Sequence, residues 1–239
     1  QLPLEWAATT LVGDDPLKGL GKAKPAGLLL TQLHTAIGSP KRSVALVSPY
    51  FVPTNAGVQA LSALRQQGIR VRVMTNAYEA TDVPLVHAGY AKYRKALLMQ
   101  GVELYEMQRM APPSTHARLN PLGSSGSSLH AKTFAVDGKR AFVGSFNFDP
   151  RSALLNTELG VVIESPALAQ QIEQAFEAHI PGLSYRLALD SQGALVWQLR
   201  QESEGSLVPN TALTREPGTN CFSRSMLRVL ALLPMDWLL

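Results

Sequence analysis

One stretch constrains the fold more than any other, and it covers residues 128–147 with the sequence SLHAKTFAVDGKRAFVGSFN. Residues 129–136 have the β-branched and aromatic content of a strand, and residues 141–143 have the pattern of the strand that returns. Asp137-Gly138, between them, is a strong signal for a two-residue hairpin turn. The sequence therefore predicts an antiparallel hairpin, which is a rigid support for the side chains that it carries.

The polar side chains of this hairpin suit a phosphate group. Side chains alternate between the two faces of a strand, so His130 and Lys132 are expected to project from the same face. The return strand leads into Gly144 and Ser145, which are small enough for a close backbone approach, and then into Asn147, whose amide can donate a hydrogen bond. A histidine can act as nucleophile or general acid, while the lysine, hydroxyl and carboxamide bind phosphate oxygens. This set of groups needs no metal and no cofactor.

The spacing of these residues resembles the HKD signature of the phospholipase D superfamily. The pattern His-x-Lys-x4-Asp-x6-Gly-Ser-x-Asn is carried by His130, Lys132, Asp137, Gly144, Ser145 and Asn147, and the resemblance continues through Asp149, Arg151, Ser152, Asn156 and Glu158. It implies that His130, Lys132, Asn147 and Glu158 are catalytic, with the acidic residue orienting an imidazole, and that Ser145 contacts substrate. Asp137, the first residue of the predicted turn, is expected to serve local structure, as is Gly144.

Phospholipase D active sites need two HKD histidines, one to form a phosphohistidine and one to protonate the leaving group. This sequence has one HKD motif. The partner is therefore either a first half upstream in the same chain or a second copy in a homodimer. The Gln1 start has no positively charged region followed by an apolar core, so we expect a cut end of something longer instead of a signal peptide. In that arrangement His130 is the general acid, by analogy with two-motif members.

The first half of the sequence resembles the second half of bacterial cardiolipin synthases of the phospholipase D type. The matching segments are residues 48–53, 75–76, 81–84 and 87–102, and residues 215–217 and 233–234 add to the likeness. Tyr50 and Phe51 follow an expected parallel strand, where α/β sheets place groups that contact ligands, although they could equally close the core. His87 is a further candidate for contact with substrate. Asp82, just before it, could simply cap a helix.

The order of the remaining patterns predicts a mixed α/β fold. Strands at 43–47, 69–74 and 102–105 alternate with helices at 57–67 and 84–99, which favours parallel βαβ units and a largely parallel sheet flanked by helices. A strand at 157–164, a helix at 166–179 and an antiparallel pair at 183–189 and 194–199 follow. We expect a loop-rich lead-in at 1–25, a catalytic domain at 26–200 with one HKD motif, and a C-terminal tail and helix at 201–239.

Composition limits the class of protein but not its substrate. Hydrophobic residues make up 46% of the 239 residues, enough for a substantial core, and the single cysteine excludes an internal disulfide and favours a reducing compartment. Residues 1–120 carry 13 Lys and Arg against 7 Asp and Glu, whereas residues 121–239 carry 9 against 11. This asymmetry is compatible with an anionic lipid surface, with nucleic acid, and with ordinary solvated faces.

The resemblance implies an enzyme that makes cardiolipin by transferring a phosphatidyl group through a phosphohistidine. It would act on an anionic phospholipid at a membrane surface, as a peripheral protein on the cytoplasmic side of the bacterial inner membrane. Two alternatives stay open, a phosphodiesterase that hydrolyses phospholipid or nucleic acid and a non-catalytic binding domain. At the C-terminus, Arg224 and Arg228 among apolar residues fit either a helix lying at a membrane interface or a helix docked on the sheet.

Overall fold

The computed structural model describes residues 4–109, 129–203 and 206–232. Its described strands form one mixed sheet of ten strands in the order β1-β7-β6-β5-β2-β3-β4-β8-β9-β10. Their bounds are β1 Ala8–Gly13, β2 Ser43–Val47, β3 Arg70–Asn76, β4 Glu103–Met107, β5 Thr133–Val136, β6 Arg140–Gly144, β7 Leu159–Glu164, β8 Ser184–Leu189, β9 Leu195–Ser203 and β10 Ser206–Leu213. The N-terminal segment takes part in this sheet, because β1 pairs antiparallel with β7.

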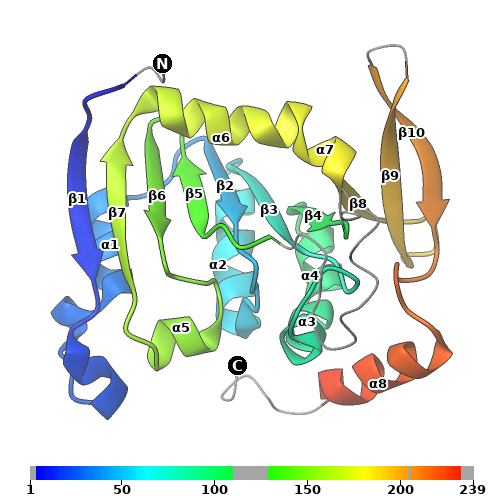
Figure 1. Ribbon diagram of the computed structural model, residues 1–239, viewed down its shortest axis with the longest axis horizontal. Coiled ribbons are helices and arrows are strands. Elements are labelled where there is room, and N and C mark those ends of the chain that lie inside the picture. The colour runs from blue at the N-terminus through cyan, green and yellow to red at the C-terminus, as the bar shows by residue number, and fades with distance from the viewer. Residues whose placement is uncertain (1–3, 110–128, 204–205, 233–239) are drawn as a thin grey trace, which may run out of the picture.

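Helices cover both faces of the sheet (Figure 1). They are α1 Leu29–Ile37, α2 Thr54–Gln66, α3 Pro84–Ala91, α4 Arg94–Met99, α5 Pro150–Leu154, α6 Pro166–Ala178, α7 Ile180–Leu183 and α8 Cys221–Leu232, with short 3-10 helices η1 Pro16–Leu20 and η2 Pro25–Gly27. Figure 1 shows α6 and α7 in front of the central strands and α1 and α2 behind them. The mixed α/β class predicted from the sequence is confirmed.

Alternate residues of β2 serve the two faces. Ala45 and Val47 pack in one cluster with α6, whereas Leu46 packs on the other side with α2 and α4. A strand that is buried on both faces has a continuous apolar run instead of an alternating one, and residues 43–47 show this run. The parallel β2-α2-β3 unit was therefore predicted correctly. Among the described strands, only the pairs β2–β3 and β3–β4 are parallel and the other seven pairs are antiparallel, so the sheet is less parallel than expected.

The HKD hairpin forms, with its turn where it was predicted. Asp137 and Gly138 both have positive φ, 57° and 62°, and the amide of Lys139 donates to the carbonyl of Val136 at 3.0 Å. The first strand starts later than expected, at Thr133 instead of residue 129. The ladder ends just beyond it, where the Gly144 amide donates to the Lys132 carbonyl at 3.2 Å. His130 and Lys132 therefore precede the strand.

Two further differences concern the second half of the structure. The helix expected at 84–99 is two helices, α3 and α4, separated by a turn at Lys92 and Tyr93. Strand β10 lies in the range assigned to the tail, and it contains Pro209. The structure accommodates this proline because β10 is the last strand of the sheet and its register shifts between Pro209 and Thr211. The expected loop at 108–128 falls almost entirely outside the described residues.

Candidate active site

His130 and Lys132 lie at the edge of the sheet where β2 and β3 end. The side chain of His130 is exposed, and the Lys132 ammonium folds back to donate to the His130 carbonyl at 3.3 Å. The two residues are therefore adjacent, although no strand holds them on one face as predicted. Among the described residues, no hydrogen bond or ion pair occupies the His130 imidazole. The ring is left available for chemistry.

A buried asparagine fixes the backbone just before His130. Asn76, the last residue of β3, accepts a hydrogen bond from the Leu129 amide at 3.0 Å and donates to the Leu129 carbonyl at 3.2 Å. Two bonds to the backbone of one residue hold that residue in position and orientation. Residues 129–132 lie outside a strand, so no β-ladder holds their backbone. The two hydrogen bonds from Asn76 fix the backbone next to His130 instead.

Ser145 and Glu158 form the second part of the site. The Ser145 hydroxyl donates to the Glu158 carboxylate and accepts from the Leu159 amide at 3.0 Å. The sequence predicted that Glu158 orients an imidazole, but within the described residues its carboxylate bonds to Ser145 instead. His130 is exposed and precedes its strand, whereas Ser145 directly follows β6, beside the start of β7, so the orientation of an imidazole by Glu158 stays a prediction.

Glu158 is buried and is held in place from the N-terminal segment. Its backbone amide donates to the Asp14 carboxylate at 3.0 Å, and its carbonyl accepts from the Asp14 amide at 2.8 Å. Asp14 also pairs with the buried ammonium of Lys18 at 2.7 Å, and Lys18 donates to the Ser152 carbonyl at 2.8 Å. The segment expected to be a lead-in therefore supports the start of β7 and of the site.

The environment of Lys132 connects it to three carboxylates. Burial lowers the pKa of the Lys132 ammonium below its usual range, and the negative charges of Glu158, Asp149 and Asp82 act in the opposite direction. A carboxylate acts on a partly buried ammonium in this way only when it is close. The negative charges of Glu158, Asp149 and Asp82, which come from three different elements or loops, therefore all act on the Lys132 ammonium.

Tyr50 belongs to the same surface. Its hydroxyl contacts both oxygens of Asp82, at 3.0 and 2.9 Å. Burial, the hydrogen bond to Asp82 and the charges of Asp82 and Asp149 together raise the pKa of Tyr50 to about 12. The phenol is therefore neutral over the whole physiological range. The position predicted for Tyr50, at the carboxyl end of β2, agrees with the structure.

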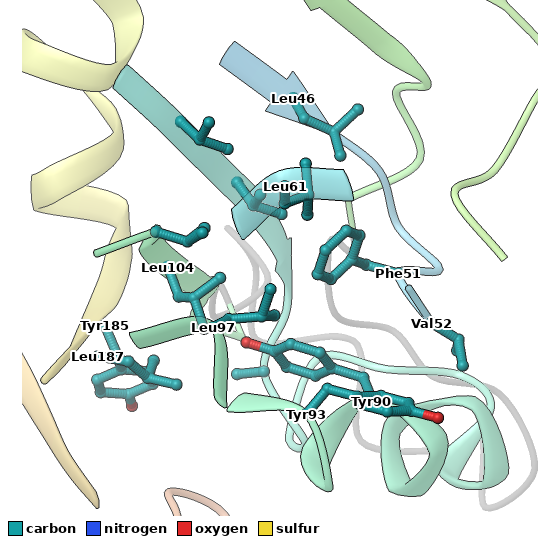
Figure 2. Close-up of a cluster of buried hydrophobic side chains, with 14 of the residues drawn as sticks. Leu46, Phe51, Val52, Leu61, Tyr90, Tyr93, Leu97, Leu104, Tyr185 and Leu187 are labelled. Atoms are coloured by element: carbon teal, nitrogen blue, oxygen red, sulfur yellow. The ribbon is translucent and has the colours of Figure 1, made fainter. Parts of the chain in front are cut away.

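Phe51 and His87, the other two residues predicted to contact substrate, lie inside the protein. Phe51 is 1% exposed, and Figure 2 shows its ring in the core cluster, where it meets Tyr90 edge to face at 5.7 Å. His87 is 3% exposed, and its Nε2 lies 2.6 Å from the Glu216 carboxylate. Both positions correct the prediction, because a substrate at the His130 edge cannot reach a side chain enclosed by other residues.

His87 and Glu216 are part of a buried ionic network. Arg94 pairs with Glu216 at 2.6 Å and with Glu106 at 2.7 Å, and the Trp197 indole donates to Glu106 at 2.8 Å. Burial opposes the charge of Glu216, but Arg94 and His87 more than compensate and lower its pKa to about 2. The network connects the segment before α8 to α3, α4, β4 and β9.

Asn147 retains an unused polar atom. Its Oδ1 is buried and has no hydrogen-bond partner among the described residues. Buried polar atoms are usually paired, so the Asn147 carboxamide keeps a hydrogen-bonding capacity that a bound group could use. Because a carboxamide can be turned by 180° with little change in shape, the same position can offer its NH2 donors to an oxygen.

Asp137 and Gly144 lie where structural roles would place them. The carboxylate of Asp137 accepts hydrogen bonds from the amides of Lys41, Arg42 and Ser43. Burial opposes its ionisation, but these three amides hold the pKa of Asp137 below its usual range. A Cβ at Gly144 would meet the Leu159 carbonyl oxygen at 2.5 Å. The turn and the strand pair therefore depend on these two residues.

Sequence reasoning missed Asp14, Lys18, Asn76 and Asp82 as supports of the site. Asp82 carried one signal, since it lies before a helix in a matching segment, but a helix cap explained it equally well. The partners of these residues are distant in sequence, as the separation between Asp14 and Glu158 illustrates. Such pairs become visible only in the fold.

Neither a cluster of metal ligands nor a membrane-spanning helix is found in the described part of the chain. No group of three or more His, Cys, Asp or Glu residues in it is arranged to hold a metal ion. None of its helices combines the length and apolar character that crossing a bilayer requires.

Comparisons with known proteins give this geometry a context. A profile of the family described as "Cardiolipin synthase, PLD-like domain" matches residues 33–180. Cardiolipin synthase C of Escherichia coli (strain K12) is 47% identical over 240 residues, which cover 100% of this chain and 50% of that protein. Probable cardiolipin synthase YwiE of Bacillus subtilis (strain 168) is 31% identical over 144 residues, 60% of this chain and 25% of that protein.

One solved structure shows the same fold. Nuc from Salmonella typhimurium, a phospholipase D family member, superposes with a TM-score of 0.53 at 18% identity, covering 77% of this chain and 99% of Nuc. The comparison covers nearly all of Nuc, whereas the chain spans half or less of the length of the two curated relatives.

Proposed function

The chain belongs to the family of the cardiolipin synthase, PLD-like domain, and on this premise we propose that it carries one of the two HKD motifs of a phosphatidyltransferase. The reaction is the transfer of a phosphatidyl group between lipid head groups through a phosphohistidine. The observation that supports it best is that the unoccupied His130 imidazole and the Lys132 ammonium lie next to each other at one sheet edge, where the charges of three carboxylates act on the ammonium. The buried Oδ1 of Asn147, which has no hydrogen-bond partner among the described residues, belongs to the same sequence motif.

The first half of the reaction transfers the phosphatidyl group to the enzyme. The histidine of the other HKD motif, which this chain does not carry, attacks phosphorus, an N–P bond forms, and the P–O bond to the leaving head group breaks. His130 donates its proton to the leaving oxygen, which departs as an alcohol. Lys132 holds the non-bridging oxygens while negative charge builds on them.

The second half reverses these roles. His130, now neutral, accepts the proton of an incoming alcohol, whose oxygen attacks phosphorus as the N–P bond breaks. If the alcohol is the glycerol head group of a second phosphatidylglycerol, the product is cardiolipin. If water enters instead, the product is phosphatidic acid, so the incoming group alone separates transfer from hydrolysis.

The second histidine comes from an upstream half of the same chain or from a second copy. The 50% coverage of Cardiolipin synthase C supports the first arrangement, and the 99% coverage of Nuc is compatible with a unit of this size that stands alone. Both arrangements leave the chemistry assigned to His130 and Lys132 unchanged.

The test replaces these two residues in the active assembly. We expect His130→Ala to lower the rate of cardiolipin formation from phosphatidylglycerol by about 10²- to 10⁴-fold, the usual contribution of a general acid. Lys132→Ala should lower it by about 10²-fold, because the charge on phosphate is then poorly neutralised. The products are separated by chromatography and identified by mass spectrometry.

His34→Ala is the matched control, since His34 is an exposed histidine on α1 and should tolerate the change. Near-normal turnover by the His130→Ala protein would contradict the assignment of the site. Phosphatidic acid as the sole product of the unmodified protein would assign hydrolysis instead of transfer.

A further inference from the structure

Helix α8 leaves an apolar stripe uncovered. Phe222, Met226, Val229 and Leu232 follow one another at helical spacing and are 77%, 36%, 60% and 84% exposed. A different face of the helix, with Leu227 buried, packs against α3. The helix is therefore docked on the fold by one face and carries a second apolar face that the described residues do not cover. Single exposed apolar residues are ordinary, but a continuous stripe marks a binding surface.

A basic cavity opens beside this helix. It has a volume of about 470 Å³, lies between α3, β9 and α8, and is lined by Lys92, Arg94, Arg215, Arg224 and Arg228. Glu216 is the one acidic side chain in the lining, and it is already paired with Arg94 and His87. The cavity therefore has an excess of positive charge.

Three of these arginines have no acidic partner among the described residues. Arg215 and Arg228 are exposed and make no ion pair or hydrogen bond with any described residue. Arg224 donates to the carbonyl of Thr219 at 2.9 Å, a neutral partner that leaves its charge uncompensated. An anion that enters the cavity would meet guanidinium groups able to bind phosphate oxygens.

Another cavity, of about 610 Å³, has a nearly balanced charge. It lies at the opposite edge of the sheet, beside the turn at Asp137. Its four basic residues are opposed by three carboxylates, with Arg42, Arg70, Arg72 and Lys139 on one side and Asp137, Glu173 and Glu177 on the other. The two cavities therefore differ in net charge, and the cavity beside α8 is the better candidate for binding an anion.

We propose that α8 and the adjoining basic cavity dock the protein on an anionic phospholipid bilayer. The apolar stripe lies at the boundary of head groups and acyl chains, and the cavity receives a lipid phosphate. An apolar stripe next to arginines without acidic partners complements the bilayer surface, where acyl chains lie directly below negatively charged head groups. In Figure 1, α8 lies along the lower edge, as does α5, which follows the HKD motif. Docking would therefore bring the catalytic edge toward its lipid substrate.

This inference deepens the proposed function, because it identifies the surface by which the chain reaches phospholipid. Binding is measured without turnover, by sedimentation with vesicles of phosphatidylcholine with and without phosphatidylglycerol. We expect Arg228→Ala to weaken binding to the anionic vesicles about five-fold and to reduce its dependence on salt. Phe222→Ser should weaken binding several-fold at high salt too, since its contribution is apolar.

Matched controls lie at the opposite edge of the sheet. Lys139→Ala removes one exposed cation at the hairpin turn, and Trp6→Ser removes an aromatic side chain that is 99% exposed before β1. Both should bind vesicles like the unmodified protein, and all four variants should melt at the unmodified temperature, because the replaced side chains are exposed. Equal losses in the α8 variants and the controls, or no loss in any variant, would overturn the proposal.

The two proposals can fail separately. Loss of cardiolipin formation by His130→Ala with unchanged vesicle binding leaves the docking surface standing. A protein that binds vesicles through α8 and yet forms no cardiolipin would refute the proposed function alone. An unmodified protein that sediments equally with neutral and anionic vesicles would refute the docking surface.

Discussion

Gly144 and Gly160 face each other across β6 and β7, and the ring of Phe142 occupies the space where a side chain on either would project. A Cβ at Gly160 would lie 2.4 Å from an atom of this ring, which is itself 1% exposed and stacked on Phe134. The glycine pair therefore lets an aromatic core residue pack against the backbone where β6 and β7 meet. Gly144 therefore belongs to the HKD motif for a packing reason, because a larger side chain there would displace Phe142.

Replacement of Gly160 tests this packing. We expect Gly160→Ala to lower the free energy of unfolding by about 1 to 3 kcal/mol, because Phe142 must leave its position in a filled core. Urea unfolding followed by circular dichroism measures the change. Gly19→Ala is the control, since the nearest atom to its new Cβ would be 3.8 Å away. An unchanged midpoint for Gly160→Ala would show that the core relaxes easily.

The segment from Glu216 to α8 is held to the fold by charge more than by apolar area. Glu216 contacts Arg94 and His87 in a network that also includes Glu106, and α8 buries Leu227 as one of its few large side chains. A buried ion pair is expensive to break by removing one partner, because the other charge stays in a poorly solvated place. The docking of this element should therefore depend on the ionisation of Glu216.

Glu216→Gln tests that dependence. We expect a loss of about 3 kcal/mol in the free energy of unfolding at neutral pH. The pKa of Glu216 falls from 4.5 to about 2 on folding, so its carboxylate stabilises the fold above pH 4.5 and this stability disappears as the pH falls toward 2. The variant should accordingly show a flatter decline than the unmodified protein between these two pH values.

Glu164→Gln is the control for this measurement. Glu164 pairs with Arg140 at 3.6 Å on the exposed rim of the sheet, and its loss should change stability by about 0.5 kcal/mol or less. If both variants showed the same small change, the network around Arg94 would contribute no more than a surface ion pair.

At the scale of the whole molecule, one sheet joins the N-terminal strand, the HKD hairpin and the C-terminal hairpin. The site draws on segments far apart in the chain, so the half-length unit supplies its own support for His130 and Lys132. The second histidine is the part that this unit does not contain. The predicted location on the cytoplasmic side of the bacterial inner membrane stays a prediction.

We expect phosphatidyl transfer to survive chelation by EDTA. Lys132 and the carboxamide of Asn147 can neutralise phosphate charge, and two imidazoles can carry out the covalent and proton-transfer steps. The assay compares initial rates of cardiolipin formation before and after chelation, with phosphatidylglycerol vesicles as substrate. A loss of activity after chelation that added zinc or magnesium restores would contradict this expectation.

The sequence by itself determined the local parts of this protein. The spacing from His130 to Asn147 identified the motif, Asp137-Gly138 identified the turn, and the apolar run at 43–47 identified a doubly buried strand, because each depends on neighbours within a few residues. The same local reasoning extended the first strand of the hairpin too far, since β-branched content does not show where a ladder ends.

Tertiary structure alone decided which side chains meet. Asn76 holds Leu129, Asp14 holds Glu158, and His87 and Phe51 lie in the interior instead of facing substrate. No local pattern encodes these outcomes, because burial and pairing depend on segments tens to more than a hundred residues apart that the sheet brings together. A catalytic motif that is defined by spacing can be recognised in the sequence. The positions of its side chains depend on contacts that form only when the chain has folded.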